Sequence, residues 1–532
     1  MSTLTNPILP GFHPDPSLTR VGDSFFIATS TFEWFGGVML YESRDLAHWR
    51  CVGPALTRQS QLDLRGVPSS SGVWAPTLSH DGLQFHLVYT LVQGEVGSFI
   101  DSHNYLVSAD SIAGPWSEPV FLNSVGIDPA LLHDDDGRHY LVNTVWEFRK
   151  EYGGKAWMRI QEIELPSGRM LGEPRLVTQG SPLPCNEGPR LLKREGWYYL
   201  ILAEGGTGYG HGVTVMRSRS VWGPYEVDPI QPDGQMLTAR NRPDLPLQKA
   251  GHASFADTPS GEWFMAYLCS RPIGDRRCIL GRETAIQKVI WTDDGWLRCA
   301  TGGTEPLITS EGPSDIEPQP WPSVPTRIEF DGTPLSPQVQ SLRIPIAEDW
   351  CSIIERPGWL RLTGQESPHS LHRQSVLGRR ITSTQFRAST RLDFSPTSFQ
   401  QMAGLAAWYD TKNFYYLRIS HDAKRGRILG LVSRVGGKVS DHFEQNIALG
   451  EGLRPHLRFQ LQGVSLQFSW SPDGLDWQDL GPELDATVLS DDFAKGFTGA
   501  FAVIAAHDMT GGAKPAWFEY WECAPGDFSL VG

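Results

Sequence analysis

The sequence predicts an all-β protein made of a five-bladed β-propeller followed by a β-sandwich. Three observations indicate this: an internal repeat in the first 300 or so residues, a proline-rich break, and renewed strand-like alternation after it. The 55 glycines and 39 prolines suit many short strands joined by tight turns.

The repeat has five copies, each with an opener, a few apolar residues, a glycine turn and an aromatic-rich strand. The copies recur at intervals of roughly 50 to 65 residues, about the length of a four-stranded blade. The openers are Asp15-Pro16-Ser17-Leu18, Trp74-Ala75-Pro76-Thr77-Leu78, Asp128-Pro129-Ala130-Leu131, Glu187-Gly188-Pro189-Arg190-Leu191 and Gly251-His252-Ala253-Ser254-Phe255.

In a propeller the innermost strand of each blade lines the central channel. We therefore expect Asp15, Trp74, Asp128, Glu187 and His252 to meet at one mouth of that channel. Asp-Pro and Glu-Gly-Pro are also ordinary turn sequences. Three acids at the same phase of a repeat favour a chemical role, and acid–base hydrolysis of a glycosidic bond needs convergent carboxylates.

The domain boundaries follow from composition. Residues 1–310 hold the propeller repeats, and residues 311–325 contain five prolines without regular periodicity, which indicates a linker. Residues 326–532 return to short alternating segments such as 414–419 and 466–470, which predict the sandwich.

The charge balance is 46 − 60 = −14 without a basic run, which disfavours nucleic acid and anionic membranes as partners. No apolar run is long enough to span a bilayer. Seven scattered cysteines predict free thiols, with Cys185 as a packing residue. The N-terminus has neither a basic start nor an apolar stretch, so we expect no signal peptide and a cytoplasmic location.

Six motifs together resemble glycoside hydrolase family 43, in particular its β-xylosidases, over essentially the whole chain. They span residues 6–17, 73–76, 126–129, 186–189, 203–209 and 280–284. The resemblance implies that the sandwich is of the jelly-roll, concanavalin-like kind. It also implies an inverting exo-glycosidase that releases xylose from the non-reducing end of short β-1,4-xylooligosaccharides.

The resemblance assigns three catalytic roles. Asp15 corresponds to the general base, Glu187 to the general acid, and Asp128 to the carboxylate that tunes the pKa of the acid. Arg282 corresponds to an arginine that neutralises Asp128. The residues expected to bind substrate are Phe32, Trp74, Ala75, Ile127, Thr207, His252 and Arg282. The chain departs from many relatives at Arg190, where they carry histidine.

His252 has three interpretations: it binds water in the channel, it touches substrate, or it lies near a calcium ion, as in some family members. No ring of acids surrounds His252 in the sequence, and calcium prefers oxygen ligands. We therefore expect no required cofactor and no metal site, with calcium near His252 as the open alternative.

The expected partners are xylooligosaccharides or oligosaccharides derived from arabinoxylan, and a homo-oligomer is left open. In the xylosidases that the chain resembles, a sandwich loop closes the pocket. The segment 506–512 is the candidate for that loop, with an ordinary hairpin turn as the alternative.

Three other functions are alternatives to the β-xylosidase. An α-L-arabinofuranosidase, as the main or a second activity, would use the same scaffold. The retaining invertase-like family would need Asn-Asp-Pro-Asn-Gly, Arg-Asp-Pro and Glu-Cys signatures, where this chain has His-Pro-Asp-Pro, Ile-Asp-Pro and Glu-Gly-Pro. A non-catalytic sugar-binding propeller would have no reason to keep both Asp15 and Glu187.

Overall fold

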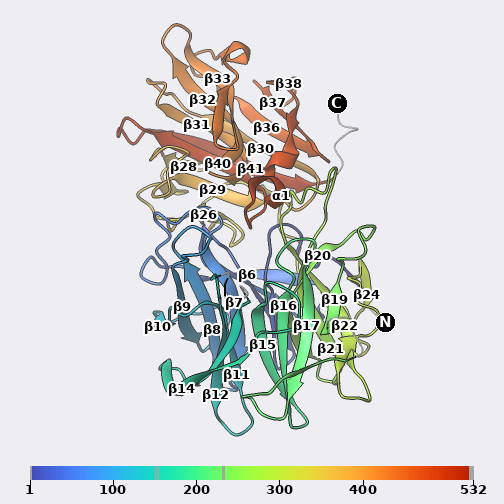
Figure 1. Cartoon of the computed structure of the whole chain (residues 1–532). Coiled ribbons are helices and arrows are strands. Elements are labelled where there is room, and N and C mark those ends of the chain that lie inside the picture. Colours follow the sequence, from blue (N-terminus) through green and yellow to red (C-terminus); the bar gives the residue numbers. More distant parts are fainter. Residues whose placement is uncertain (1–2, 150, 152–154, 230–233, 527–532) are drawn as a thin grey trace.

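The computed structural model describes residues 3–149, 151, 155–229 and 234–526. These residues form two β-domains stacked end to end, with the propeller at the bottom and the sandwich at the top of Figure 1. Helical structure within them is limited to α1 (Asp491–Ala494) and short 3-10 turns such as η3 (Phe443–Gln445) and η4 (Ala486–Leu489). No helix in these ranges is long and apolar enough to cross a membrane.

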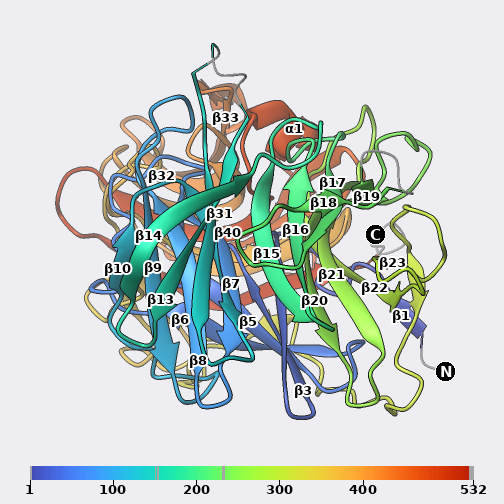
Figure 2. The ribbon, with the colours of Figure 1, turned by 60° about the horizontal axis from the view of Figure 1, so that its bottom comes forward.

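Five antiparallel sheets form the blades of the propeller, and Figure 2 shows them from the side away from the sandwich. Blade 1 holds β2 (Ser17–Val21), β3 (Ser24–Thr29), β5 (Gly37–Ser43) and β6 (Trp49–Leu56). Blade 2 holds β7 (Gly72–His80), β8 (Phe85–Val92), β9 (Ser102–Ala109) and β10 (Val120–Asn123). Blade 3 holds β11 (Ile127–His133), β12 (His139–Val145), β13 (Trp157–Glu164) and β14 (Arg169–Thr178).

The last two blades complete the ring. Blade 4 holds β15 (Glu187–Arg194), β16 (Trp197–Glu204), β17 (Gly212–Ser218), β18 (Glu226–Val227) and β19 (Gln235–Thr238). Blade 5 holds β20 (Gln248–Asp257), β21 (Trp263–Ser270), β22 (Glu283–Trp291) and β23 (Leu297–Cys299). Inner strand β2 neighbours both β7 and β20, so the first and last blades are adjacent.

The first and last strands of the propeller domain pair with each other beside blade 5. Strand β1 (Thr3–Thr5) pairs with β24 (Thr309–Glu311), which follows the last blade. The buried Asn6 side chain then donates hydrogen bonds to the carbonyls of Ile286 and Leu307, both at 2.8 Å. These bonds satisfy buried carbonyl groups and fasten the first residues to the ring.

Every inner strand carries the same local distortion in or just before its first half. The residues Asp15, Ala75, Asp128, Gly188 and His252 all have positive φ, between 39° and 58°. In blades 2 to 5 a register shift in the pairing with the next strand spans this residue. Such bulges re-aim side chains next to active sites, so the repeat delivers one redirected position per blade at the same end of the channel.

The sandwich consists of two nine-stranded sheets packed around an apolar core that includes Leu417, Phe459 and Trp521. One sheet holds β27 (Cys351–Ser352), β28 (Leu360–Thr363), β41 (Pro515–Pro525), β30 (Gln385–Asp393), β36 (His456–Gln462), β37 (Ser465–Ser471), β38 (Gln478–Asp479), β25 (Arg327–Ile328) and β39 (Leu484–Asp485). The other holds β34 (Lys438–Asp441), β33 (Gly426–Val435), β32 (Asn413–Asp422), β31 (Gln401–Asp410), β40 (Phe501–Asp508), β29 (Ser375–Arg380), β26 (Gln340–Leu342), β4 (Trp34–Phe35) and β35 (Ile447–Ala448).

The second sheet crosses between the domains. Its edge strand β4 belongs to a loop of blade 1, and it pairs with β26 through Phe35 and Ser341. The propeller and the sandwich therefore share backbone hydrogen bonds as well as side-chain packing. The predicted architecture of a five-bladed propeller followed by a β-sandwich is confirmed, while the boundaries at residues 310 and 325 stay predictions. All seven cysteines are unpaired, as expected.

Candidate active site

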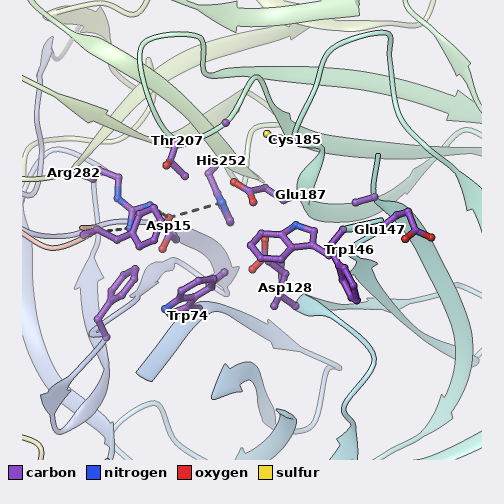
Figure 3. Close-up of a pocket in the computed structure, with 17 residues that line it drawn as sticks. Asp15, Trp74, Asp128, Trp146, Glu147, Cys185, Glu187, Thr207, His252 and Arg282 are labelled. Carbon is purple, nitrogen blue, oxygen red and sulfur yellow. Dashed lines mark hydrogen bonds and ion pairs between the residues drawn. The ribbon is translucent and has the colours of Figure 1, made fainter. Parts of the chain in front are cut away.

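All ten predicted site residues line one cavity of about 340 Å³, which Figure 3 shows in close-up, and Phe497 of the sandwich lines it too. They come from all five blades and from loops between strands. The ten are Asp15, Phe32, Trp74, Ala75, Ile127, Asp128, Glu187, Thr207, His252 and Arg282. The convergence predicted from the repeat is therefore present, with the three carboxylates facing the same small space.

Asp15 is held by two partners. Its Oδ1 accepts a hydrogen bond from Arg282 Nη1 at 2.9 Å, and its Oδ2 accepts one from the Ser30 hydroxyl at 2.6 Å. The side chain is buried, and burial alone would raise the pKa of its carboxyl. The Arg282 charge is the largest of several influences, the Ser30 hydrogen bond among them, that together outweigh burial and hold the pKa of Asp15 below its ordinary value. Asp15 is thus a carboxylate that stays ionised.

The pairing of Arg282 corrects one expectation. The resemblance implied that this arginine neutralises Asp128, but its ion pair in the structure is with Asp15. The guanidinium lies 5.3 Å from the ring centroid of Phe32 and 5.8 Å from that of Phe497, close enough for cation–π attraction. Two aromatic rings and a carboxylate therefore fix its position, and its charge acts on Asp128 only as a weaker, more distant influence.

Asp128 and Glu187 form the other side of the pocket. Asp128 Oδ2 accepts a hydrogen bond from the Gly188 amide at 2.9 Å, and its own amide donates to Thr90 Oγ1 at 3.0 Å. Burial and the neighbouring carboxylates raise the pKa of both side chains, with the Asp128 charge as the largest electrostatic influence on Glu187. Glu187 therefore keeps a proton at a pH where Asp15 has lost its own.

The position of Glu187 within the repeat differs from the prediction. The sequence suggested that the three acids occupy the same phase, but the bulge residue of blade 4 is Gly188, and Glu187 precedes it. A Cβ at position 188 would lie 2.8 Å from the His252 ring, so only glycine fits there. The acid is consequently supplied by the preceding residue, which is equivalent to Trp74 in blade 2 and Ile127 in blade 3.

His252 lies against the carboxylates without a strong bond to them. Its Nδ1 is 3.9 Å from Asp15 Oδ1, and its Nε2 is buried without a protein hydrogen-bond partner in the described residues. Burial lowers the pKa of His252 to about 3, so the ring is neutral. Asp15, the carboxylate with the largest electrostatic influence on the His252 ring, is already bonded to Arg282 and Ser30, and the charges of Arg190 and His211 also act on the ring. These side chains do not fit an oxygen-rich calcium cage.

Seven further residues line the pocket and were not predicted: Trp146, Glu147, Phe148, Ala156, Cys185, Gly206 and Phe497. Most lie on loops between strands, where no periodic signal exists. Cys185 was interpreted as a packing residue, but it is exposed at the pocket, so that interpretation is wrong. Its closeness in sequence to Glu187 was the signal that could have found it.

The sandwich contributes to the pocket through a different segment from the one expected. The candidate segment 506–512 forms the end of β40 and part of the turn toward β41, and it borders a separate cavity lined by Trp350, Glu366 and Asp508, among others. Phe497, between α1 and β40, instead enters the active site. Its amide donates to Ser70 Oγ at 3.0 Å, and its carbonyl accepts from Arg282 Nη2 at 3.1 Å.

Arg190, the residue that departs from the expected pattern, is buried behind the acids. Its Nη1 donates to the Pro189 carbonyl at 3.3 Å, and burial lowers the pKa of its guanidinium to about 10. Its positive charge works against the rise in the pKa of Asp128. Arg190 therefore adds a fixed cation under the pocket without touching the catalytic face.

One pocket of a size to hold a sugar thus contains an ionised carboxylate and a protonated carboxyl group. Glycoside hydrolases use such a pair to cleave the glycosidic bond. The chain belongs to glycosyl hydrolases family 43, whose family model matches residues 4–297. Residues 327–524 match the beta xylosidase C-terminal concanavalin A-like domain, which confirms the kind of sandwich expected.

Similar proteins span the full length of the chain. A xylan 1,3-beta-xylosidase from a Vibrio species is 42% identical, covering 98% of this chain and 99% of that protein. Xylosidase/arabinosidase 43B of Humicola insolens is also 42% identical, covering 99% and 98%. The crystal structure of a xylan beta-1,4-xylosidase from Bacillus halodurans C-125 superposes with a TM-score of 0.95 at 46% identity, covering 98% and 99%.

Proposed function

We propose that the protein is an inverting exo-β-xylosidase that releases xylose from the non-reducing end of short β-1,4-xylooligosaccharides. The observation that carries the proposal is the convergence of Asp15, Asp128 and Glu187 on one pocket, with Asp15 alone paired to Arg282. This arrangement lowers the pKa of Asp15 and raises the pKa of Glu187. When the environment moves the pKa values of two carboxyl groups in opposite directions, the group with the lower pKa serves as the base and the group with the higher pKa as the acid.

In the proposed reaction, Glu187 donates its proton to the glycosidic oxygen as the bond to the anomeric carbon breaks. A water molecule attacks that carbon from the opposite face, and Asp15 accepts the proton that the water loses. The two carboxyl groups must be roughly 6.5 to 9.5 Å apart to admit this water. Asp128 keeps Glu187 protonated through its charge, and Arg282 keeps Asp15 ionised.

The pocket favours removal of single terminal sugars. Its walls include the aromatic rings of Phe32, Trp74, Trp146 and Phe497, and one of these comes from the sandwich. Aromatic faces provide apolar contact for a sugar ring, while Arg282 and His252 offer polar atoms for its hydroxyl groups. A wall supplied by a second domain narrows a propeller channel mouth that would otherwise be an open groove.

A second activity on α-L-arabinofuranosides follows from one comparison. The relative from Humicola insolens carries both activities in its name and aligns over nearly all of this chain. Xylopyranose and arabinofuranose present similar hydroxyl groups, so the same acid and base would serve both. The relatives also carry 1,3- and 1,4-linkage names, and for this chain we propose the 1,4 linkage of the more similar solved structure.

Proton NMR of xylobiose hydrolysis tests the proposal most directly. An inverting β-xylosidase releases α-xylose first, and the β-anomer appears later by mutarotation. β-Xylose as the first product would contradict inversion. The proposed substrate would be contradicted if the enzyme hydrolysed 1,3-linked xylobiose or an arabinofuranoside but not β-1,4-xylobiose. A cytoplasmic location stays a prediction, which cell fractionation would check.

A further inference from the structure

A buried ion cluster joins the two domains beside the active site. Lys249, on β20 of the propeller, places its ammonium nitrogen 2.9 Å from Asp491 Oδ2 and 2.8 Å from Asp492 Oδ1. Both acids belong to α1 of the sandwich, which lies at the face turned toward the propeller (Figure 1). The Lys249 side chain is 3% exposed. Ion pairs of this kind remain strong because little solvent screens them.

The cluster also contains the ligand atoms of a potential metal site, formed by Cys278, Asp491 and Asp492. Two observations argue against that use. The Lys249 ammonium already lies between the two carboxylates, and the Cys278 amide donates to Asp492 Oδ2 at 2.8 Å. Those donors bond three of the four carboxylate oxygens, and Asp491 Oδ1 is left without a partner among the described residues. With the ammonium already between the two acids, the cluster is better explained as a connection between domains.

A short chain of contacts leads from this cluster to the base. Helix α1 ends at Ala494, and Phe497 follows within three residues. The Phe497 carbonyl accepts a hydrogen bond from Arg282 Nη2 at 3.1 Å, while Nη1 of the same guanidinium donates to Asp15 at 2.9 Å. The guanidinium group of Arg282 is planar and rigid. A hydrogen bond from Nη2 to the Phe497 carbonyl therefore also constrains the direction in which Nη1 points toward Asp15.

We propose that Lys249, Asp491 and Asp492 form a positioning element for the proposed hydrolysis: they hold the sandwich segment so that the Phe497 carbonyl keeps Arg282 directed at Asp15. None of the three lines the pocket. Their effect on the reaction is transmitted by the segment 491–497 and by Arg282. The inference rests on the proposed role of Asp15 as the base.

The predicted signature is a change in the pH profile. Arg282 is the main electrostatic reason that Asp15 stays ionised to low pH, so a misdirected Arg282 raises the pKa of the base. The acid limb of kcat/KM then moves to higher pH. The other groups that act on Asp15, and that the variants leave in place, are His252, His211, Ser30, Asp128 and Glu187. The groups that face Lys249 are Asp491, Asp492, Cys278, Tyr209 and His211.

The test compares wild type with Lys249→Met, in xylobiose hydrolysis across pH. Methionine keeps the unbranched shape of lysine without its charge. We expect kcat/KM to fall by about 10- to 100-fold, the effect of a small misplacement of catalytic groups. We also expect the acid limb of the kcat/KM profile to move to higher pH by about one unit. A folded Lys249→Met enzyme with an unchanged limb and an unchanged kcat/KM overturns the inference.

A second variant covers the case in which Lys249→Met leaves two buried carboxylates unpaired and does not fold. Lys249→Met combined with Asp491→Asn and Asp492→Asn removes all three charges together, which a buried site tolerates better than an unpaired charge. The same shift in the acid limb is expected. Its crystal structure gives a readout independent of activity: an Arg282–Asp15 bond still at 2.9 Å, with Phe497 in place, overturns the inference.

Lys193 provides a matched control. It also places one ammonium between two carboxylates, those of Asp134 and Asp135. It lies six residues from Glu187 along β15, which at about 3.3 Å per residue is about 20 Å from the acid. Lys193→Met is expected to leave the acid limb unchanged. An equal shift in both variants would show a general loss of stability and overturn the inference.

The same experiment separates this inference from the proposed function. Wild-type enzyme is assayed first with β-xylosides and α-L-arabinofuranosides. Absence of turnover by wild type contradicts the proposed function. Normal turnover by wild type, with unaltered pH dependence in both Lys249 variants, contradicts the positioning role and leaves the proposed function intact.

Discussion

Asp15 and Glu187 begin inner strands of different blades, and both are enclosed in the same pocket, yet their pKa values move in opposite directions. Burial alone would raise both. The difference is the partner: Asp15 is paired with a guanidinium, whereas Glu187 has another carboxylate, Asp128, as its main charged neighbour. The repeat thus fixes where the acids lie, and the charge of the main neighbour, Arg282 for Asp15 and Asp128 for Glu187, decides which one carries a proton.

Removing the ionised carboxylate, Asp15, is expected to have the largest effect on the rate of hydrolysis. Asp15→Asn keeps the size of the side chain, and asparagine tolerates the left-handed backbone at this position. We expect kcat on xylobiose to fall by about 10³- to 10⁴-fold, because no base takes the proton from water. Initial rates measure this. Xylose binding by calorimetry should persist, and a rate within tenfold of wild type would remove Asp15 as the base.

Removing the protonated side gives an effect that depends on the leaving group. Glu187→Gln should lower kcat on xylobiose by about 10²- to 10³-fold, since an alkoxide leaves poorly without a proton. An aryl xyloside with an acidic phenol needs no such help and should lose far less. Parallel rates on the two substrates check this. Equal losses on both would argue against Glu187 as the acid.

Reducing the difference between the pKa values of Asp15 and Glu187 should shift the pH optimum of the reaction. Activity is lost as pH rises through the pKa of Glu187, because the acid must be protonated. Asp128→Asn removes the charge that raises this pKa, so the basic limb of kcat/KM should move down by about one pH unit. A pH–rate profile measures the shift. An unchanged basic limb would mean that burial alone sustains the proton on Glu187.

A change that leaves both carboxyl groups alone should have the smallest effect. Trp146 lines the pocket, so Trp146→Ala removes apolar contact with the sugar. We expect KM to rise by about 2- to 10-fold, the range for one aromatic contact. Both pH limbs should stay where they are. A displaced limb in this variant would show that Trp146 also affects the acid or the base.

The fold and the convergence of the three carboxylates could be predicted because both follow from the repeat. The Asp-Pro and Glu-Gly-Pro openers recur at blade spacing, and in a propeller equal phase means equal height in the channel. The one-residue offset of Glu187 could have been found in the openers, because aligning Pro189 with Pro16 and Pro129 places Gly188 at the position of Asp15 and Asp128. The structure supplies the reason for glycine there, since the His252 ring lies where a Cβ at position 188 would be. That contact joins two different blades.

The remaining misses have a different cause. Arg282 was assigned to Asp128 from resemblance, and its bond to Asp15 depends on a carbonyl of Phe497 from the other domain. Phe497 itself has no motif around it, and its role depends on how the sandwich packs on the propeller. Ser30 holds Asp15 from the residue after β3, where serine carries no distinctive signal. Side-chain pairing across domains is set by tertiary contacts that local patterns do not encode.

The residue of positive φ in each blade gives this protein five comparable positions around one axis. Only Asp15 and Asp128 place an acid at this position, while Ala75 leaves its position without a functional group. New chemistry can therefore be introduced on this ring by exchanging one side chain, with no rebuilding of the main chain.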